Sequence, residues 1–202
     1  MNGALVWLLV GLGLAVIVVR RRSLAVGLVT VQALVLAASA VHSSSGADVA
    51  AAFALAVRAV VLGALLLFVV SRTREPRPVR AGIAPLARGG IAVALALALT
   101  WLIPRFGLDS RSVERGVIAL VAFGVATVAV RRATLFHVLG IVLAENGLAL
   151  AALRLPSGSS LAIELGVAFD LTLVALVAVV FHERIFAEFG AGDSAALRTL
   201  RD

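Results

Sequence analysis

The chain has 202 residues, of which 62% are apolar and only 14% are charged, whereas a typical globular domain is ~45–50% apolar and ~25% charged. A chain of this length cannot bury so much apolar surface within itself, because small domains leave a large fraction of their surface exposed. These proportions exclude a soluble enzyme, a nucleic-acid-binding domain and a disordered tail. They predict an all-α, polytopic bundle of transmembrane helices whose first partner is the lipid bilayer.

The net charge of +7 does not indicate a nucleic-acid partner. All 18 basic residues are arginines, and they form short clusters between apolar runs, as in the cytoplasmic loops of polytopic membrane proteins. The chain contains no cysteine, which excludes disulfides, thiolate-bound clusters and reactive thiols. The three histidines are scattered, so we expect no metal site, no cofactor and no catalytic group of the chain's own.

Seven apolar runs predict about seven spans, at residues 3–19, 23–41, 49–70, 87–103, 113–130, 133–153 and 161–181. A helix needs ~20 residues to cross the core of a bilayer, so the fourth and fifth runs are the least certain in their ends. The first run is interpreted as an anchor and not as a cleaved signal peptide, because its positive charges follow the apolar stretch.

The distribution of arginine predicts the orientation. If the N-terminus lies outside, thirteen arginines fall in cytoplasmic segments, four in outer loops and one inside a span. This bias satisfies the positive-inside rule and predicts a multi-pass protein of the cell (inner) membrane with a cytoplasmic C-terminus. Trp7 and Trp101 would then both lie near the outer interface, where amphipathic rings are favoured.

A proline-containing loop, 71–90, suggests the domain organisation. We predict an N-terminal region at 1–90, made of three membrane helices and this cytoplasmic loop. A four-helix region follows at 91–181, and a cytoplasmic tail at 182–202. The tail is either a docking segment or a frayed terminus.

Ionisable residues far from both interfaces are the most informative in such a chain. Glu145 and Arg58 each lie about 18 Å from the inner ends of their runs, and Asp170 about 16 Å, at 1.5 Å per residue. Gln32 is close to the same layer, Asn146 is next to Glu145, and Glu164 lies nearer the outer end. The sequence therefore predicts a polar layer at the middle of the membrane.

This layer suggests a relay for protons or charge. An isolated charge at the bilayer centre costs ~2.5–3.5 kcal/mol on insertion scales, so several charges in one layer indicate mutual compensation or a hydrated path. Arg58, Glu145 and Asp170 are the predicted relay residues, and Glu164 is either a point of proton access or an interface residue. The alternative for the carboxylates is a static ion pair with Arg58. Gln32 and Asn146 are interpreted as supporting polar contacts between helices.

Two segments carry a resemblance to a known family. HVLGIVLAENG, from His137 to Gly147, and ELGVAFD, from Glu164 to Asp170, resemble the membrane component E of hydrogenase-4 and its relatives among the group 4 energy-converting hydrogenases. The tail and the surroundings of Gln32 are similar as well, and Arg58 stands where the family tends to carry a Lys. The last three helices of that family in turn resemble the small K subunit of respiratory complex I and the C subunit of multisubunit cation/proton antiporters.

The resemblance implies a function as well as a fold. In those subunits two intramembrane carboxylates on successive helices link the proton route to antiporter-like subunits. Glu145 matches the first of these positions, and Asp170 stands at the second, where the complex I subunit has Glu. The chain is then expected to be a non-catalytic membrane subunit of a hydrogenase-4-like, complex I-related oxidoreductase. Its partners would be antiporter-like membrane subunits and peripheral redox subunits. The alternatives are a subunit of a multisubunit cation/proton antiporter and a purely structural membrane-arm subunit.

Overall fold

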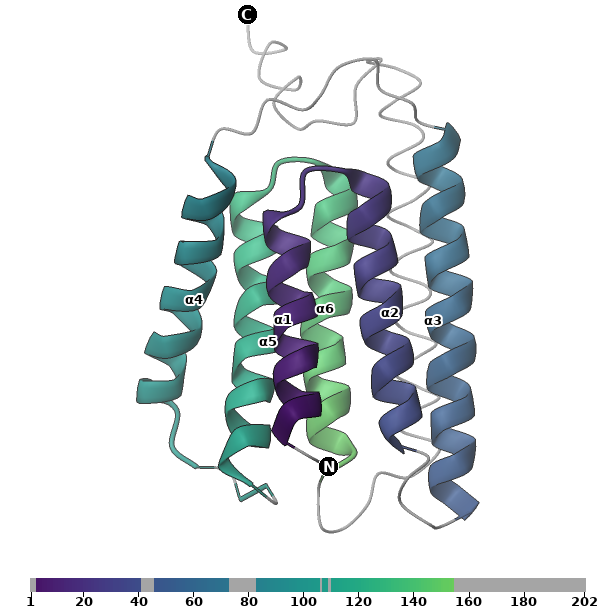
Figure 1. Cartoon of the computed structure of the whole chain (residues 1–202), viewed down its shortest axis with the longest axis vertical. Helices are drawn as coiled ribbons and strands as arrows, with labels where there is room; N and C mark the ends of the chain where they lie inside the picture. The colour runs from purple at the N-terminus through teal and green to yellow at the C-terminus, as the bar shows by residue number, and fades with distance from the viewer. Residues whose placement is uncertain (1–2, 41–45, 73–82, 106, 109, 155–202) are drawn as a thin grey trace, which may run out of the picture.

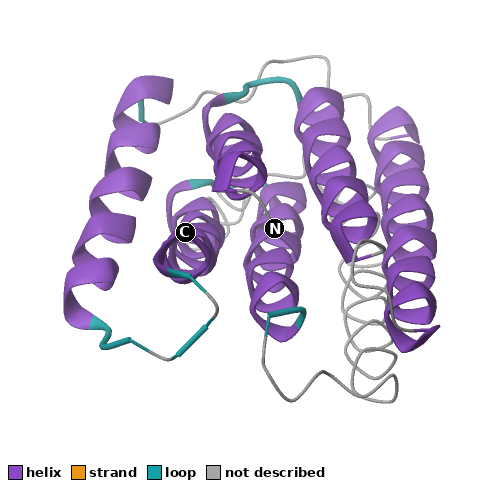
Figure 2. Ribbon diagram, turned by 60° about the horizontal axis from the view of Figure 1, so that its bottom comes forward, coloured by secondary structure: helices purple, strands orange, loops and turns teal. Residues whose placement is uncertain are grey.

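The computed structural model describes residues 3–40, 46–72, 83–105, 107–108 and 110–154. Within these ranges the chain is helical and forms no β-strand (Figure 2). The predicted run 161–181, with Glu164 and Asp170, and the tail 182–202 lie outside the described residues.

The described chain forms six α-helices that follow the first six apolar runs to within a few residues (Figure 1). They are α1 Gly3–Val18, α2 Arg22–Ala40, α3 Gly46–Arg72, α4 Pro85–Leu102, α5 Arg111–Val130 and α6 Thr134–Ala152. Five of them, α2 to α6, are long and apolar enough to cross a membrane. Helix α1 is apolar but has only 16 residues, which span about 24 Å. The described residues thus agree with the predicted bundle of apolar membrane helices, and the number of spans stays a prediction.

Four helices form the centre of the bundle and two flank it. Helices α1, α2, α6 and α5 pack in a ring, in which each contacts the next and α5 closes on α1. Helix α3 packs mainly against α2, at one edge of the bundle, and α4 packs against α5 and α1 at the other edge (Figure 1). Because α1 contacts α4 and α5, helices from both sides of position 90 pack together, and the predicted domain division stays untested.

Glycines allow α5 and α6 to lie in close contact. A Cβ atom on Gly124 would lie 2.5 Å from the carbonyl oxygen of Gly140, and a Cβ on Gly140 would lie 2.7 Å from the carbonyl oxygen of Gly124. The contact continues along both helices, because a Cβ on Gly147 of α6 would lie 3.0 Å from the Cβ of Leu120 of α5. Small residues at helix crossings let backbones approach in membranes, and this crossing fixes the rotation of α6 within the bundle.

The outward faces of the flanking helices are apolar. Phe53, Val60 and Phe68 of α3 are exposed, as are Leu86 and Leu97 of α4. Large exposed apolar patches are rare on soluble monomers and mark surfaces that contact a membrane or a protein partner. They are the surfaces that lipid covers in a membrane bundle.

The helices alternate in direction, so the connections between them gather at two ends. The α1–α2 and α5–α6 connections lie at the same end as the last turn of α3 and the first turn of α4 (Figure 1). This end carries Arg20, Arg72, Arg88 and Arg131, and is called the arginine-rich end below. Trp101 belongs to the opposite end, near the end of α4. Among the described residues the opposite end carries Arg105, Arg111, Arg115 and Arg154, and the predicted orientation of the bundle stays a prediction.

Candidate functional site

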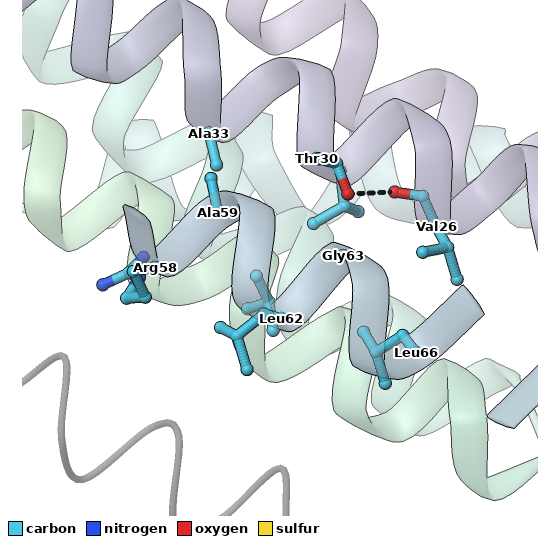
Figure 3. Close-up of a pocket in the computed structure, with 10 residues that line it drawn as sticks. Val26, Thr30, Ala33, Arg58, Ala59, Leu62, Gly63 and Leu66 are labelled. Carbon is cyan, nitrogen blue, oxygen red and sulfur yellow. Dashed lines mark hydrogen bonds between the residues drawn. The ribbon is translucent and has the colours of Figure 1, made fainter. Parts of the chain in front are cut away.

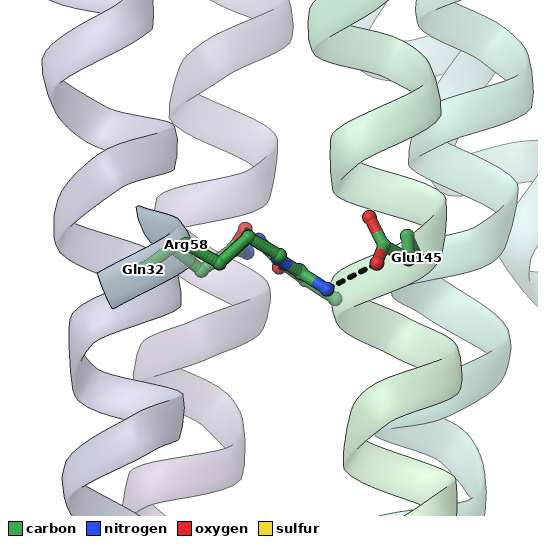
Figure 4. Close-up of polar contacts among 4 residues, drawn as sticks. Gln32, Arg58 and Glu145 are labelled. Carbon is green, nitrogen blue, oxygen red and sulfur yellow. Dashed lines mark hydrogen bonds and ion pairs between the residues drawn. The ribbon is translucent and has the colours of Figure 1, made fainter. Parts of the chain in front are cut away.

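Four polar side chains meet at the middle of the bundle. Gln32 comes from α2, Arg58 from α3, and Glu145 and Asn146 from α6. They are 0%, 6%, 7% and 1% exposed, respectively. Figure 4 shows Gln32, Arg58 and Glu145 at one level of the bundle, and each lies near the middle of its helix in sequence. The layer expected from helix rise thus brings these residues together.

Arg58 and Glu145 form a buried ion pair. Arg58 Nη1 donates to Glu145 Oε1 (Figure 4), and the side chain reaches α6 from the flanking helix α3. Arg58 Nη2 donates to Asn146 Oδ1 at 3.3 Å. A charge that is buried in a membrane helix is expected to pair with an opposite charge, and Arg58 and Glu145 compensate each other in this way.

An amide branch continues from the pair towards α1. Asn146 Nδ2 donates to Gln32 Oε1 at 3.0 Å, and Gln32 Nε2 donates to the carbonyl oxygen of Leu9 at 2.7 Å. Gly13 leaves room for this amide, because a Cβ atom there would lie 3.2 Å from Gln32 Nε2. The polar layer therefore connects α3, α6, α2 and α1 through side-chain contacts.

The ion pair is only partly satisfied. Glu145 Oε2 and Arg58 Nε are buried and have no hydrogen-bond partner among the described residues. Figure 4 shows this second carboxylate oxygen directed away from Arg58. A buried polar atom without a partner is costly, and in native structures it has a specific cause, such as a catalytic role, stored strain or a bound water molecule.

A small cavity adjoins Arg58 on its side towards the arginine-rich end. Its volume is about 10 Å³, which is about the space of one water molecule. The wall from α2 includes Val26 and Thr30, and the wall from α3 includes Leu62 and Gly63 (Figure 3). Thr30 Oγ1 donates to the carbonyl oxygen of Val26 at 2.9 Å. Thr30 and Arg58 are the polar side chains in a lining that is otherwise apolar.

The remaining predicted relay residues cannot be placed. Asp170 and Glu164 lie outside the described residues, so their positions relative to Glu145 stay predictions. The relay roles of Arg58 and Glu145 and the supporting roles of Gln32 and Asn146 also stay predictions, although the contacts between these side chains are now defined.

Two buried charged residues escaped the sequence reasoning. Glu114, 8% exposed, accepts hydrogen bonds from the backbone N–H groups of Gly107 at 3.0 Å and Leu108 at 3.2 Å. It secures the connection before α5, and its place four residues after the cap residue Ser110 was the available signal. Arg88, which lies where the predicted loop 71–90 and the predicted run 87–103 overlap and which we counted with the loop, is 1% exposed and lies inside α4. Its position after Pro85, a frequent first residue of helices, could have revealed this.

Neither a group of metal ligands nor a similar known protein identifies the chemistry of this site. The described part of the chain contains no group of three His, Cys, Asp or Glu side chains that could hold a metal ion. Comparison with protein-family models, with curated proteins and with solved structures gives no match to this chain.

Proposed function

We propose that this chain is a membrane subunit of a hydrogenase-4-like, complex I-related energy-converting oxidoreductase of the cell (inner) membrane. In this role it conducts no redox chemistry itself and contributes to the movement of protons or charge within the membrane. The observation that carries the proposal is the buried Arg58–Glu145 pair at the middle of the bundle, in which one carboxylate oxygen has no partner among the described residues. The sequence resemblance around Glu145 supplies the class of host complex.

The two members of the pair have different roles in this mechanism. Arg58 stays charged and cannot pass a proton on, so it sets the field that acts on Glu145. A proton arriving at the layer binds Glu145 Oε2, because Oε1 is engaged by Arg58. Protonation removes the negative charge from Glu145 and weakens the ion pair. The guanidinium then turns towards another acceptor, for which Asp170 is the predicted candidate.

The decisive experiment compares two buried carboxylates in the intact complex. Glu145→Gln is expected to abolish proton uptake by inverted vesicles while the redox reaction of the peripheral subunits continues. Glu114→Gln is the matched control, because it removes a carboxylate of similar burial from the end of the bundle, and proton uptake should persist. Undiminished proton uptake in Glu145→Gln would contradict the relay.

The class of host complex is tested separately. The tagged chain is purified from its native membrane in mild detergent, and the metals of the co-purifying proteins are measured. Nickel and iron in stoichiometric amounts are expected for a hydrogenase-type host, whereas iron alone indicates another complex I-like oxidoreductase. A large complex with neither metal would move the assignment to a multisubunit cation/proton antiporter, which salt-driven exchange without an electron donor would then establish.

A purely structural subunit is the second candidate, and the amide branch favours it. Both the Asn146–Gln32 contact and the Gln32–Leu9 contact tie helices together without any exchangeable charge. Normal proton uptake in an Arg58→Met, Asp170→Asn double variant, with the complex intact, would favour this function over the relay.

A further inference from the structure

Arg88 presents an unusual environment for a charged side chain. It is the fourth residue of α4 and is 1% exposed. All three of its guanidinium nitrogens are buried without a hydrogen-bond partner among the described residues. Burying an uncompensated charge costs several kcal/mol, so a guanidinium in this state requires an anion from some source.

The nearest charges increase this requirement. Arg20 and Arg131 both lie close enough to Arg88 for electrostatic repulsion. Burial, together with the neighbouring charge of Arg88, lowers the pKa of Arg131 to about 10. Within the described residues, therefore, three arginines gather at one place and none of them has a carboxylate partner.

The geometry holds this cluster in a fixed place between α1, α4 and the α5–α6 connection. Arg131 donates through Nη2 to the carbonyl oxygen of Val19, at the end of α1, and its guanidinium lies 3.5 Å from the centre of the Phe136 ring. Helix α4 comes close to the same end of α1, since a Cβ atom on Gly89 would lie 3.2 Å from the Val18 side chain. The first turn of α4 also contributes backbone N–H groups and the positive end of the helix dipole.

We propose that Arg20, Arg88 and Arg131 form a binding site for the phosphate of an anionic lipid headgroup. Arg88 lies in the first turn of α4, and Arg20 and Arg131 lie in the α1–α2 and α5–α6 connections at the same end of the bundle. In a membrane bundle the ends of the helices meet the headgroup region. Helix α4 stands at the edge of the bundle with exposed apolar side chains, so acyl chains have a surface on which to lie. Basic sites between membrane helices on the cytoplasmic side bind anionic headgroups, and guanidinium groups bind phosphate in a bidentate manner.

The test uses the full chain in an uncharged detergent, with thermal unfolding as the readout. Short-chain phosphatidylglycerol is expected to raise the unfolding midpoint of the wild type saturably, while short-chain phosphatidylcholine leaves it unchanged. Arg88→Met should lose this response. In detergent without phosphatidylglycerol, Arg88→Met should instead unfold at a higher temperature than the wild type, because it removes a buried charge that no anion compensates.

Two further variants serve as a control and as a milder substitution in the cluster. Arg72→Met removes an exposed arginine at the same end, and it should keep the full response to phosphatidylglycerol. Arg20→Gln changes an exposed member of the cluster, so folding is preserved, and the apparent affinity for phosphatidylglycerol should fall roughly tenfold, as expected for a charge-assisted hydrogen bond.

Three results would overturn the proposal. The first is an unchanged response to phosphatidylglycerol in both Arg88→Met and Arg20→Gln. The second is a lower midpoint of Arg88→Met in lipid-free detergent, which would show that a carboxylate of the chain already compensates Arg88. The third is an equal rise with inorganic phosphate at the same concentrations, which would assign the site to a small free anion and not to a lipid.

Discussion

Arg58 and Arg88 are both buried in the bundle, but only Arg58 has a carboxylate partner among the described residues. Arg58, at the middle of the helices, has a carboxylate and an amide from α6 within reach. Arg88, one turn into α4, has two arginines as its charged neighbours and no acceptor among the described residues. Depth explains the difference, because a charge at the bilayer centre must be compensated by the protein itself, whereas a charge at the interface has lipid phosphates nearby.

The largest effect that would test this comparison is the removal of one member of the central pair. Arg58→Met leaves Glu145 buried without its counter-charge and should lower the free energy of unfolding by ~3–5 kcal/mol. The double variant Arg58→Met, Glu145→Leu removes both charges and should recover most of this loss. Unfolding of the purified chain in lipid bicelles measures both values.

The direction of the change in the unfolding midpoint distinguishes the two arginines. In uncharged detergent Arg58→Met should destabilise the chain, and Arg88→Met should stabilise it, although both substitutions replace a buried guanidinium with the same side chain. If the two variants shift the unfolding midpoint in the same direction, the distinction between a protein-compensated and a lipid-compensated arginine is wrong.

An intermediate effect is expected where the two central helices touch. Gly140→Ala places a methyl group against the backbone of α5 and should cost ~1–3 kcal/mol, as overpacking in a filled interior does. The change would also move α6 and with it Glu145, so proton uptake should fall. Gly27→Ala is the control, because a Cβ atom there meets nothing within 4 Å, and neither stability nor proton uptake should change.

The smallest effect is expected in the amide branch. Gln32→Leu removes the contacts to Asn146 and to the Leu9 carbonyl and should cost ~0.6–1.7 kcal/mol, the range of interhelical hydrogen bonds in membranes. The same unfolding assay measures it. A loss as large as that of Arg58→Met would show that the pair and the branch act as one unit, and the separation of their roles would then fail.

Much of the fold could be predicted because arginine clusters and turns interrupt the apolar runs. The predicted run 133–153 corresponds to α6 at Thr134–Ala152, and 23–41 to α2 at Arg22–Ala40. The ends of α3 extend beyond the prediction, at Gly46 and Arg72, since polar residues in a helix at the interface do not end it. The length of α1 was also overestimated, by one residue.

The polar layer was predictable only along the membrane normal. A constant rise per residue gives the depth of Arg58, Gln32 and Glu145, but nearly all-apolar helices carry no pattern that reveals their rotation. The contacts of Gln32 with Leu9 and Asn146 therefore did not follow from the sequence. The rotation of α6 depends on Gly124 and Gly140, whose close approach is a property of two helices together and not of either segment alone.

The amide branch also limits where a proton can go. Each donor along it, from Arg58 through Asn146 and Gln32, is an N–H group that stays protonated at physiological pH, and the last acceptor is the backbone carbonyl of Leu9. The amide branch therefore holds its dipoles in fixed directions but contains no group that can take up or release a proton. A proton held by Glu145 cannot leave towards α1 by this branch, so any route through the layer must use Glu145 Oε2, which has no partner among the described residues.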